Sequence, residues 1–341
     1  MKLAPIINKN SLPRTDLMKK NANNLISITI PTYNRAPFLD ACLEYHIPLA
    51  RKHNVKIFIS DNASDDNTQD VVKRRCAEYS LISYTRNAIN IGPDANFEQA
   101  LKLADTKYVW LLGDTYKLPE KGLDYSVNLL TSCSVIYDLI VFNWKNRVKD
   151  TPSQDYTNPN KLLSDIGWHM TCISTLVYRT DMLRVCNFKG YLDTNFIQTG
   201  IIFDYISSHE HLVHWNRDIS VETIFIDGVK KNTWPEYRFE IWFERWPKFI
   251  FSLPPLFLFS SKIKAIKDHG VKSKAFSLKN LLMMRFNNLL DVSVYKKYRY
   301  IMPLTISHPR SLIILCISIL PIFVIKFFRW VFSKLSLGSL K

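Results

Sequence analysis

The sequence predicts an α/β fold in which helices flank a mainly parallel sheet. Two apolar, β-branched runs at 26–30 and 57–59 lie about thirty residues apart, and a helix-compatible segment separates them. That arrangement is typical of one βαβ unit. An uninterrupted apolar run at 107–112 predicts a further strand that is buried on both faces. Because ligands of parallel sheets bind beyond the carboxyl ends of the strands, the polar turns after these runs form the candidate site.

The other elements are placed by their periodicity and by the turns between them. Apolar residues recur at helical spacing from Val71 to Tyr79 and predict a helix there. We further expect a strand at 81–84, a polar loop at 86–96, helices at 96–103 and near 120–130, and apolar strands at 139–142 and near 172–178.

The positive charge of the chain is concentrated in its last hundred residues. Of the formal net charge of +15, +14 belongs to 241–341, which holds 17 Lys and Arg against 3 acidic residues. The nearly neutral remainder argues against an enzyme with a basic catalytic domain for nucleic acids, so we expect no nucleic-acid partner. Aromatic residues are interleaved with the basic ones, and this mixture favours contact with an anionic membrane surface.

Four polar blocks occur in order along the first third of the chain. They read Pro31-Thr32-Tyr33-Asn34-Arg35, Ser60-Asp61-Asn62-Ala63-Ser64-Asp65-Asp66, Asn90-Ile91-Gly92-Pro93-Asp94-Ala95-Asn96-Phe97 and Trp110-Leu111-Leu112-Gly113-Asp114. With these blocks, residues 25–130 resemble the family 2 glycosyltransferases, which are nucleotide-sugar-dependent enzymes with the Rossmann-like GT-A fold. The third block and Asn195-Phe196-Ile197-Gln198 are most similar to the O-antigen branch that includes abequosyltransferases.

The resemblance implies a pocket for a nucleotide-diphosphate sugar at the strand ends. In that pocket Pro31, Tyr33 and Arg35 lie near the base, and Asp61 meets its polar edge. The implied donor-binding residues are Pro31, Thr32, Tyr33, Arg35, Asp61, Asn62, Asn90, Gly92, Asp94, Asn96, Gly113 and Asp114. Turn-forming and helix-capping roles are the alternative for the block at 61–66 and for the loop at 92–96.

The fourth block departs from the family pattern, because one acidic residue stands where two or three are usual. The sequence there reads Asp114-Thr115-Tyr116. A divalent cation often takes one or two protein carboxylates plus phosphate oxygens, so Asp114 remains the expected ligand for Mg²⁺ or Mn²⁺. The alternatives are a leaving diphosphate neutralised by basic side chains, and a catalytically weak or inactive protein. The basic candidates are Arg86, Lys230, Lys231 and Arg238.

Transfer with inversion needs a base that takes the proton of the acceptor hydroxyl, and a carboxylate suits this task. The resemblance places such a base several tens of residues beyond the acidic block, which leaves Asp193 and Asp204 as catalytic candidates. The alternatives are a structural acid for Asp204, which lies in the apolar run 201–206, and a loop or cap residue for Asp193.

We therefore expect three parts: a flexible N-terminus at 1–24, a GT-A catalytic domain at 25–228 and a basic, aromatic-rich helical region at 229–341. Segment 311–332 is expected to associate with the membrane. Its apolar run falls short of the about 20 residues of a membrane-spanning helix, which favours an in-plane or re-entrant helix over a short span or a soluble core helix. The N-terminal residues lack the apolar core of a signal peptide, so we expect the cytoplasmic face of the inner membrane.

The sequence thus predicts a hexosyl- or deoxyhexosyl-transferase of O-antigen or capsule synthesis, with a lipid-linked (polyprenyl diphosphate) oligosaccharide as acceptor. The second interpretation is a GT-A-fold binding or scaffold protein that assists an active transferase. The reduced acidic block favours the scaffold, whereas the complete donor pocket favours the enzyme.

Overall fold

The computed structural model describes residues 24–132, 135–229 and 237–324. Within it the chain forms two compact units that are discontinuous in sequence. The first unit contains the chain up to Lys145 together with Ile173–Val185 and Leu212–Phe225. The second contains Asn146–Cys172, Cys186–His211 and the chain from Ile226 onward. The boundary expected near residue 228 stays a prediction.

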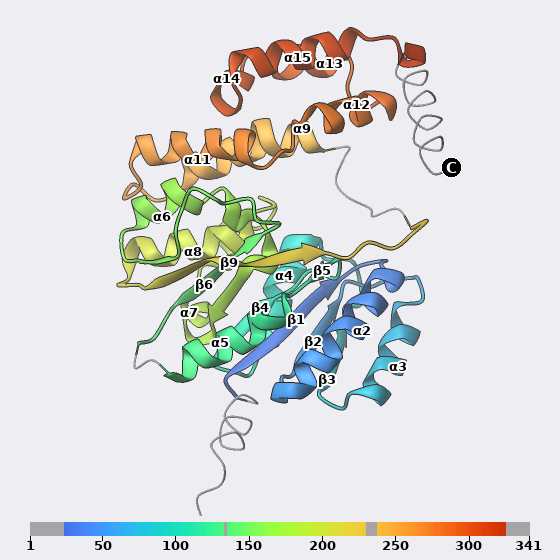
Figure 1. Ribbon diagram of the computed structural model, residues 1–341, viewed down its shortest axis with the longest axis vertical. Helices are drawn as coiled ribbons and strands as arrows, with labels where there is room; N and C mark the ends of the chain where they lie inside the picture. Colours follow the sequence, from blue (N-terminus) through green and yellow to red (C-terminus); the bar gives the residue numbers. More distant parts are fainter. Residues whose placement is uncertain (1–23, 133–134, 230–236, 325–341) are drawn as a thin grey trace, which may run out of the picture. The chain divides into compact units, whose positions relative to one another are not determined.

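The first unit begins with a parallel sheet in the strand order β3-β2-β1-β4, as Figure 1 shows. Its strands are β1 (Ile26–Thr32), β2 (Ile57–Asp61), β3 (Ile82–Arg86) and β4 (Tyr108–Leu111), and its connecting helices are α2 (Ala36–His53), α3 (Thr68–Glu78) and α4 (Pro93–Lys102). Every residue of β1, β2 and β4 is buried, which accounts for their continuous apolar runs. The prediction of a mainly parallel sheet flanked by helices is confirmed.

The expected polar loop at 86–96 is shorter than predicted, because α4 begins at Pro93 and not at Asn96. Gly92 precedes the helix with a φ of 83°, a conformation that favours glycine. Proline at the first helical position has its φ preset for the helix. Asp94 and Asn96 therefore lie in the first turns of a helix, and both are buried.

Beyond β4 the sheet becomes mixed and continues in the order β8-β6-β9-β5. These strands are β5 (Tyr116–Lys117), β6 (Leu139–Trp144), β8 (Leu176–Arg179) and β9 (Val213–Thr223), accompanied by α5 (Glu120–Ser132), the 3₁₀ turn η2 (Ile173–Thr175) and α7 (Thr180–Val185). Strand β8 runs antiparallel to both β4 and β6. Trp110 of β4 stacks on Phe142 of β6 at 4.7 Å and donates to the Ser174 carbonyl. This packing fixes β4, the strand that precedes the turn with Asp114.

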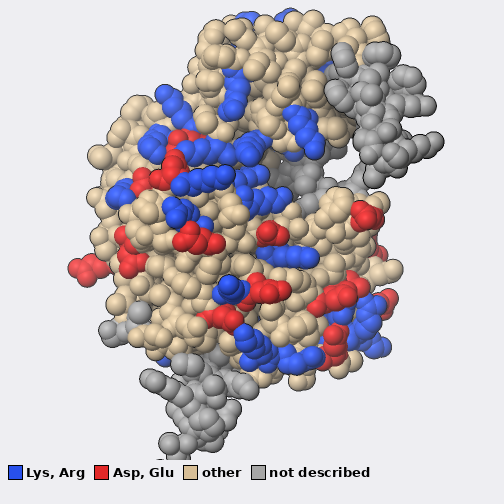
Figure 2. Space-filling model, viewed as in Figure 1, with Lys and Arg blue, Asp and Glu red and all other residues tan. Residues whose placement is uncertain are grey.

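The second unit is mainly helical. It contains β7 (Gln154–Tyr156), α6 (Pro159–Ile166), η1 (His169–Thr171), η3 (Phe188–Tyr191), α8 (Ile197–Ser208), α9 (Arg238–Glu240), a π-helical turn η4 (Ile241–Arg245), α10 (Trp246–Ser252), α11 (Phe259–Lys272), α12 (Leu278–Phe286), α13 (Val292–Tyr298), α14 (Met302–Thr305) and α15 (His308–Ile319). Its helices share an aromatic and aliphatic core in which Phe243 stacks on Phe276 at 4.5 Å. On the visible face of α12–α15, Figure 2 shows Lys and Arg side chains set in an uncharged surface.

Helix α15 (His308–Ile319) covers the first part of segment 311–332, for which a membrane role was predicted. Within the described residues, none of the helices combines the length and the apolar character that crossing a membrane requires. The inward face of α15 packs into the core of the second unit through Ile314 and Ile317. Several predictions lie outside the described residues: the N-terminus up to residue 23, Lys230, Lys231 and the last part of segment 311–332.

Candidate functional site

The polar turns after β1, β2 and β4 gather at one edge of the parallel sheet. Thr32 and Asp61, the last residues of β1 and β2, are register partners, and Asp61 is in turn the partner of Arg86 at the end of β3. Parallel strands in register bring their carboxyl ends to the same edge, so three of the four sequence blocks meet there.

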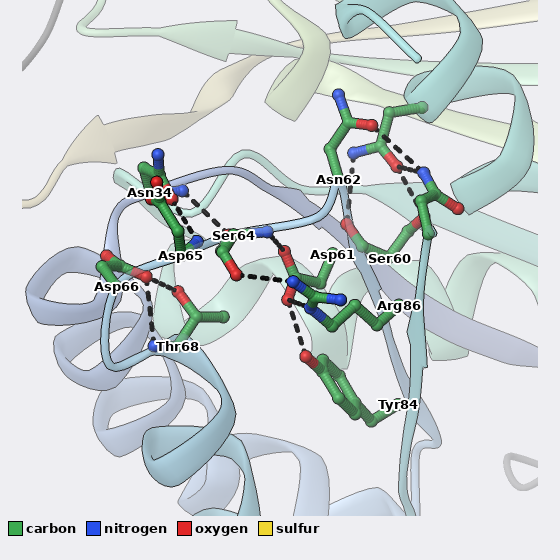
Figure 3. Close-up of polar contacts among 12 residues, drawn as sticks. Asn34, Ser60, Asp61, Asn62, Ser64, Asp65, Asp66, Thr68, Tyr84 and Arg86 are labelled. Carbon is green, nitrogen blue, oxygen red and sulfur yellow. Dashed lines mark hydrogen bonds and ion pairs between the residues drawn. The ribbon is translucent and has the colours of Figure 1, made fainter. Parts of the chain in front are cut away.

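Asp61 is fully buried. Figure 3 shows the contacts of its carboxylate, both oxygens of which have partners. One oxygen accepts from the Ser64 backbone N–H at 2.9 Å, and the other accepts from the Tyr84 hydroxyl at 2.6 Å. The Arg86 guanidinium lies 3.7 Å from that second oxygen. Burial, and then the hydrogen bond to Asp61, raise the pKa of Tyr84 far above its ordinary value. Asp61 therefore serves as the centre of a buried network.

The loop after β2 is tied to the loop after β1 by reciprocal hydrogen bonds (Figure 3). Asn34, which adopts a φ of 50°, donates its N–H to the Ser64 hydroxyl and accepts from the Asp65 N–H. Asp66 accepts from the N–H of Ala36 at the start of α2 and from both donors of Thr68 in α3. The capping role left open by the sequence thus describes the contacts of Asp66.

A set of amide side chains holds the loop before α4 against the end of β2. Asn62 accepts from Asn87 at 3.1 Å and from the Ile91 N–H at 2.9 Å, and it donates to Asn90 at 2.8 Å. Asn96 pairs with both the hydroxyl and the carbonyl of Ser60. Asn62 and Asn96 are 3% exposed, so these amides shape the edge of the site from within.

Asp114 follows β4 and is held by residues of the first block. Its carboxylate accepts from the Thr32 hydroxyl at 2.9 Å and from the Arg35 guanidinium at 3.1 Å. The backbone N–H of Gly113 donates to the Ser174 hydroxyl at 3.0 Å, and an added Cβ at Gly113 would lie 2.9 Å from the Tyr116 ring. The turn is therefore narrow, and the guanidinium that the resemblance places near the base contacts the acidic turn.

The arrangement around Asp114 does not fit a metal site built by the protein alone. No group of three or more His, Cys, Asp or Glu residues suited to a metal ion occurs within the described part of the chain. Both carboxylate oxygens of Asp114 already accept hydrogen bonds, one of them from a positive charge. A divalent cation prefers several oxygen ligands, and in this turn the described residues supply one carboxylate, which is shared with Arg35.

Both candidates for the catalytic base belong to the second unit. Asp204 lies in α8, is partly exposed, and accepts from the Tyr191 hydroxyl at 3.3 Å. Burial, followed by the charge of Asp204, raises the pKa of Tyr191 far above its ordinary value. Asp193 is exposed in a loop and has a φ of 62°. Their catalytic roles stay predictions.

Tyr84 builds the site but was not singled out from the sequence, and the bonds that Ser64 and Asn87 make were not predicted. Tyr84, Asn87 and Ser64 act through buried hydrogen bonds that only the paired strands and loops create. The signal for Tyr84 was its place in the short strand at 81–84, one residue before the register partner of Ser60. No local pattern indicated that Arg35 pairs with Asp114 across 79 residues.

Comparisons with known proteins agree with this architecture. The family model described as Glycosyl transferase family 2 matches residues 27–183. The chain is 39% identical over 213 residues to the abequosyltransferase RfbV of Salmonella typhimurium, an alignment that covers 56% of this chain and 64% of the relative.

Two solved structures share the fold at low sequence identity. The structure of S. aureus TarS 1–349 in complex with UDP-GlcNAc has a TM-score of 0.53 at 16% identity and covers 92% of each chain. The mannosyltransferase PcManGT of Pyrobaculum calidifontis, in complex with GDP-Man and Mn²⁺, has a TM-score of 0.52 at 15% identity and covers 86% of each chain. At these identities the likeness shows the fold. Residues 27–183 thus match glycosyl transferase family 2, and the chain has the GT-A fold.

Proposed function

We propose that the protein transfers a hexosyl or deoxyhexosyl group from a nucleotide-diphosphate sugar to a lipid-linked oligosaccharide during bacterial surface polysaccharide synthesis. The observation that carries this proposal is the meeting of the Pro31–Arg35, Asp61 and Asp114 turns at the carboxyl edge of a family 2 domain. The 39% identity to an abequosyltransferase supports the sugar class and the O-antigen or capsule context.

The exposed side chains at this edge are the ones available to a donor. Tyr33 is 43% exposed to solvent, and the side chains of Arg86 and Arg35 are 35% and 28% exposed. Asp61 and Asn62 lie beneath them and hold the loops in place. We propose that an aromatic ring and two guanidinium groups contact the nucleotide, while the buried amides and carboxylate fix their positions.

We propose Asp204 or Asp193 as the base that accepts the proton of the acceptor hydroxyl. The hydroxyl oxygen attacks the anomeric carbon on the side opposite the diphosphate, the bond to the diphosphate oxygen breaks, and the configuration inverts. A divalent cation at Asp114 would supply neutralisation of the leaving diphosphate, and the Mn²⁺ complex of PcManGT supports such a cation for proteins of this fold. The contacts of Asp114 favour the alternative in which a basic side chain supplies that charge.

We also propose that the second unit binds the anionic membrane surface from the cytoplasmic side. Four large apolar side chains are exposed where α10 ends, along the connection, and where α11 begins: Phe251, Leu256, Leu258 and Phe259. Phe251 and Phe259 stack on each other at 6.0 Å. We name this group the apolar tip.

The apolar tip is held from beneath by polar contacts. Lys262 is 8% exposed, and its ammonium group donates to the carbonyls of Phe251 and Leu253. The Asn160 side chain donates to the Leu256 carbonyl and accepts from the Leu258 N–H. A rigid apolar projection on a unit rich in exposed lysines suits insertion among anionic headgroups.

The transfer reaction is tested with the full chain and a lipid extract that contains polyprenyl diphosphate oligosaccharides. We expect one nucleotide sugar among UDP, GDP, CDP and dTDP conjugates to add one sugar mass to the lipid, with inverted anomeric configuration. Either Asp204→Asn or Asp193→Asn should lower the rate by about 10²- to 10⁴-fold while donor binding persists. Asp181→Asn, at an exposed ion pair with Arg184, is the matched control. Nucleotide binding without transfer to any lipid would favour the scaffold interpretation.

Membrane binding is tested by flotation with neutral and anionic vesicles. Replacing Leu256, Leu258 and Phe259 with Ser should weaken partitioning at least about tenfold, because each buried apolar side chain contributes to insertion. Ile136→Ser with Val185→Ser removes comparably exposed apolar groups of the first unit and should change nothing. A variant that lacks the C-terminal part of segment 311–332 should be truncated from residue 325. Truncation from residue 311 would also remove Ile314 and Ile317, which belong to the core of the second unit. Undiminished binding of the triple Ser variant would refute the role of the apolar tip.

A further inference from the structure

We propose that Arg35, held in place by Asp114, is the cation that meets the diphosphate, so that the protein binds nucleoside diphosphates without a divalent cation. This inference rests on the proposed function and specifies how the same site handles charge. It assigns Asp114 the role of a positioning residue.

Arg35 and Asp114 form an ion pair at the ends of two neighbouring strands. Arg35 lies just beyond β1 and Asp114 just beyond β4, and these strands are parallel neighbours. The Arg35 Nη1 atom lies 3.1 Å from the Asp114 Oδ1 atom. The pair therefore lies at the carboxyl edge of the sheet, where ligands of such sheets bind.

The two partners of this ion pair differ in exposure to solvent. The Arg35 side chain keeps 28% of its surface exposed, whereas the Asp114 side chain keeps 3%. An anion that arrives at this edge meets the guanidinium before the carboxylate. A guanidinium carries five N–H donors in a planar fork, and this fork matches the oxygens of a phosphate group.

The carboxylate of Asp114 is held by hydrogen bonds to both of its oxygens. Its second oxygen accepts from the Thr32 hydroxyl at 2.9 Å, and Thr32 is 3% exposed at the end of β1. The carboxylate is thus anchored on one side and pairs with Arg35 on the other. A metal ion at this carboxylate would have to share it with a bound positive charge, which disfavours the ion by electrostatic repulsion.

The experiment is calorimetric titration of the full chain with UDP, CDP, GDP and dTDP, each in EDTA and in Mn²⁺. We expect one nucleoside diphosphate to bind with dissociation constants that agree within about twofold in the two buffers. Arg35→Gln should weaken its binding in EDTA by about tenfold to a hundredfold, the range for a hydrogen bond to a charged group. Affinity for the phosphate-free nucleoside should stay unchanged, because Arg35 is assigned to the diphosphate.

Further variants separate charge from folding. Arg35→Lys keeps the positive charge but lacks the planar guanidinium. Its affinity for the nucleoside diphosphate should lie between those of the wild type and Arg35→Gln. Asp114→Asn should weaken binding less than Arg35→Gln and create no response to Mn²⁺. Arg74→Gln removes an Arg–Asp pair with Asp40 on the surface and should bind like the wild type. Thermal unfolding of each variant shows whether it is folded.

Three results would overturn the inference and leave the proposed function standing. They are wild-type binding that needs Mn²⁺, unchanged diphosphate affinity in Arg35→Gln, and an equal loss of nucleoside affinity in that variant, which would place Arg35 at the base. If the wild type bound no nucleotide in either buffer, the proposed function itself would fall, and this inference with it.

Discussion

The loop after β2 and the turn after β4 lie at the same edge of the sheet but are built differently. Where β2 meets this loop, Asp61 is fully buried and has a backbone, a hydroxyl and a guanidinium partner. In the turn after β4, Asp114 depends on two side chains from the first block, Thr32 and Arg35. The first carboxylate organises a closed network, whereas the second is linked to a partly exposed cation.

This difference separates residues that shape the site from those that meet a ligand. The carboxylate and amides around β2 are satisfied by the protein itself, so a ligand gains little by contacting them. The ion pair after β4 keeps an exposed positive partner. Disruption of the first network should therefore mainly change stability, while disruption of the second should mainly change affinity.

The largest effect is expected for Asp61→Ala. The substitution leaves the Ser64 N–H, the Tyr84 hydroxyl and the Arg86 guanidinium without their carboxylate partner. We therefore expect the free energy of unfolding to fall by about 3 kcal/mol. Urea denaturation measures it, and Asp65→Ala, at an exposed neighbouring carboxylate, should stay within about 0.5 kcal/mol of the wild type. Equal stabilities of the two variants would contradict the closed network.

The next largest effect is a loss of stability at acidic pH that involves the segment after Asp114. His46 of α2 is fully buried, donates to the Cys42 carbonyl at 2.6 Å and accepts from the Leu118 N–H at 3.0 Å. Burial lowers the pKa of His46 to about 4. Between its unfolded value of 6.5 and pH 4, the unfolded chain binds a proton that the folded chain does not, so stability falls as pH falls.

For this one histidine the loss is about 1.4 kcal/mol per pH unit, or about 2 kcal/mol between pH 6.5 and pH 5. Urea denaturation across this range should give a shallower pH slope for His46→Gln than for the wild type. His269, whose pKa burial lowers to about 3, adds a similar slope from the second unit and stays in both proteins. A lower protection factor of the Leu118 amide at acidic pH would locate the effect in the segment after the Asp114 turn. An identical pH slope in the wild type and His46→Gln would contradict a contribution from His46.

The parallel half of the fold was predictable because its signals are local. Buried parallel strands have continuous apolar runs, and the runs at 57–59 and 107–112 became β2 and β4. The start of α4 was misplaced because a helix can begin at a proline inside a polar stretch. The division into two discontinuous units follows from long-range packing, which the order of residues along the chain does not reveal.

In the candidate site, the sequence indicated which turns meet but not which side chains pair. The four blocks were placed by strand ends, and Asp61 and Asp114 lie where those ends are. Their partners depend on register: Tyr84 reaches Asp61 from the neighbouring strand, and Arg35 reaches Asp114 across a parallel pair. A resemblance transfers the positions of residues, whereas the direction of a long side chain such as that of Arg35 depends on local packing.

The smallest effect compares two threonines of β1. The Thr32 hydroxyl donates to the Asp114 carboxylate. The hydroxyl of Thr29, three residues earlier and outside the Asp114 turn, donates to the Ala100 carbonyl at a distance of 2.7 Å. Thr32→Val and Thr29→Val each remove one buried hydrogen bond, so we expect a loss of about 1 kcal/mol in unfolding free energy from either. Only Thr32→Val should weaken nucleoside diphosphate binding, and by no more than about threefold, because Arg35 still pairs with the other oxygen of Asp114. Equal affinities would show that Arg35 alone fixes the carboxylate, whereas a loss as large as that of Arg35→Gln would mean that Asp114 itself contacts the ligand.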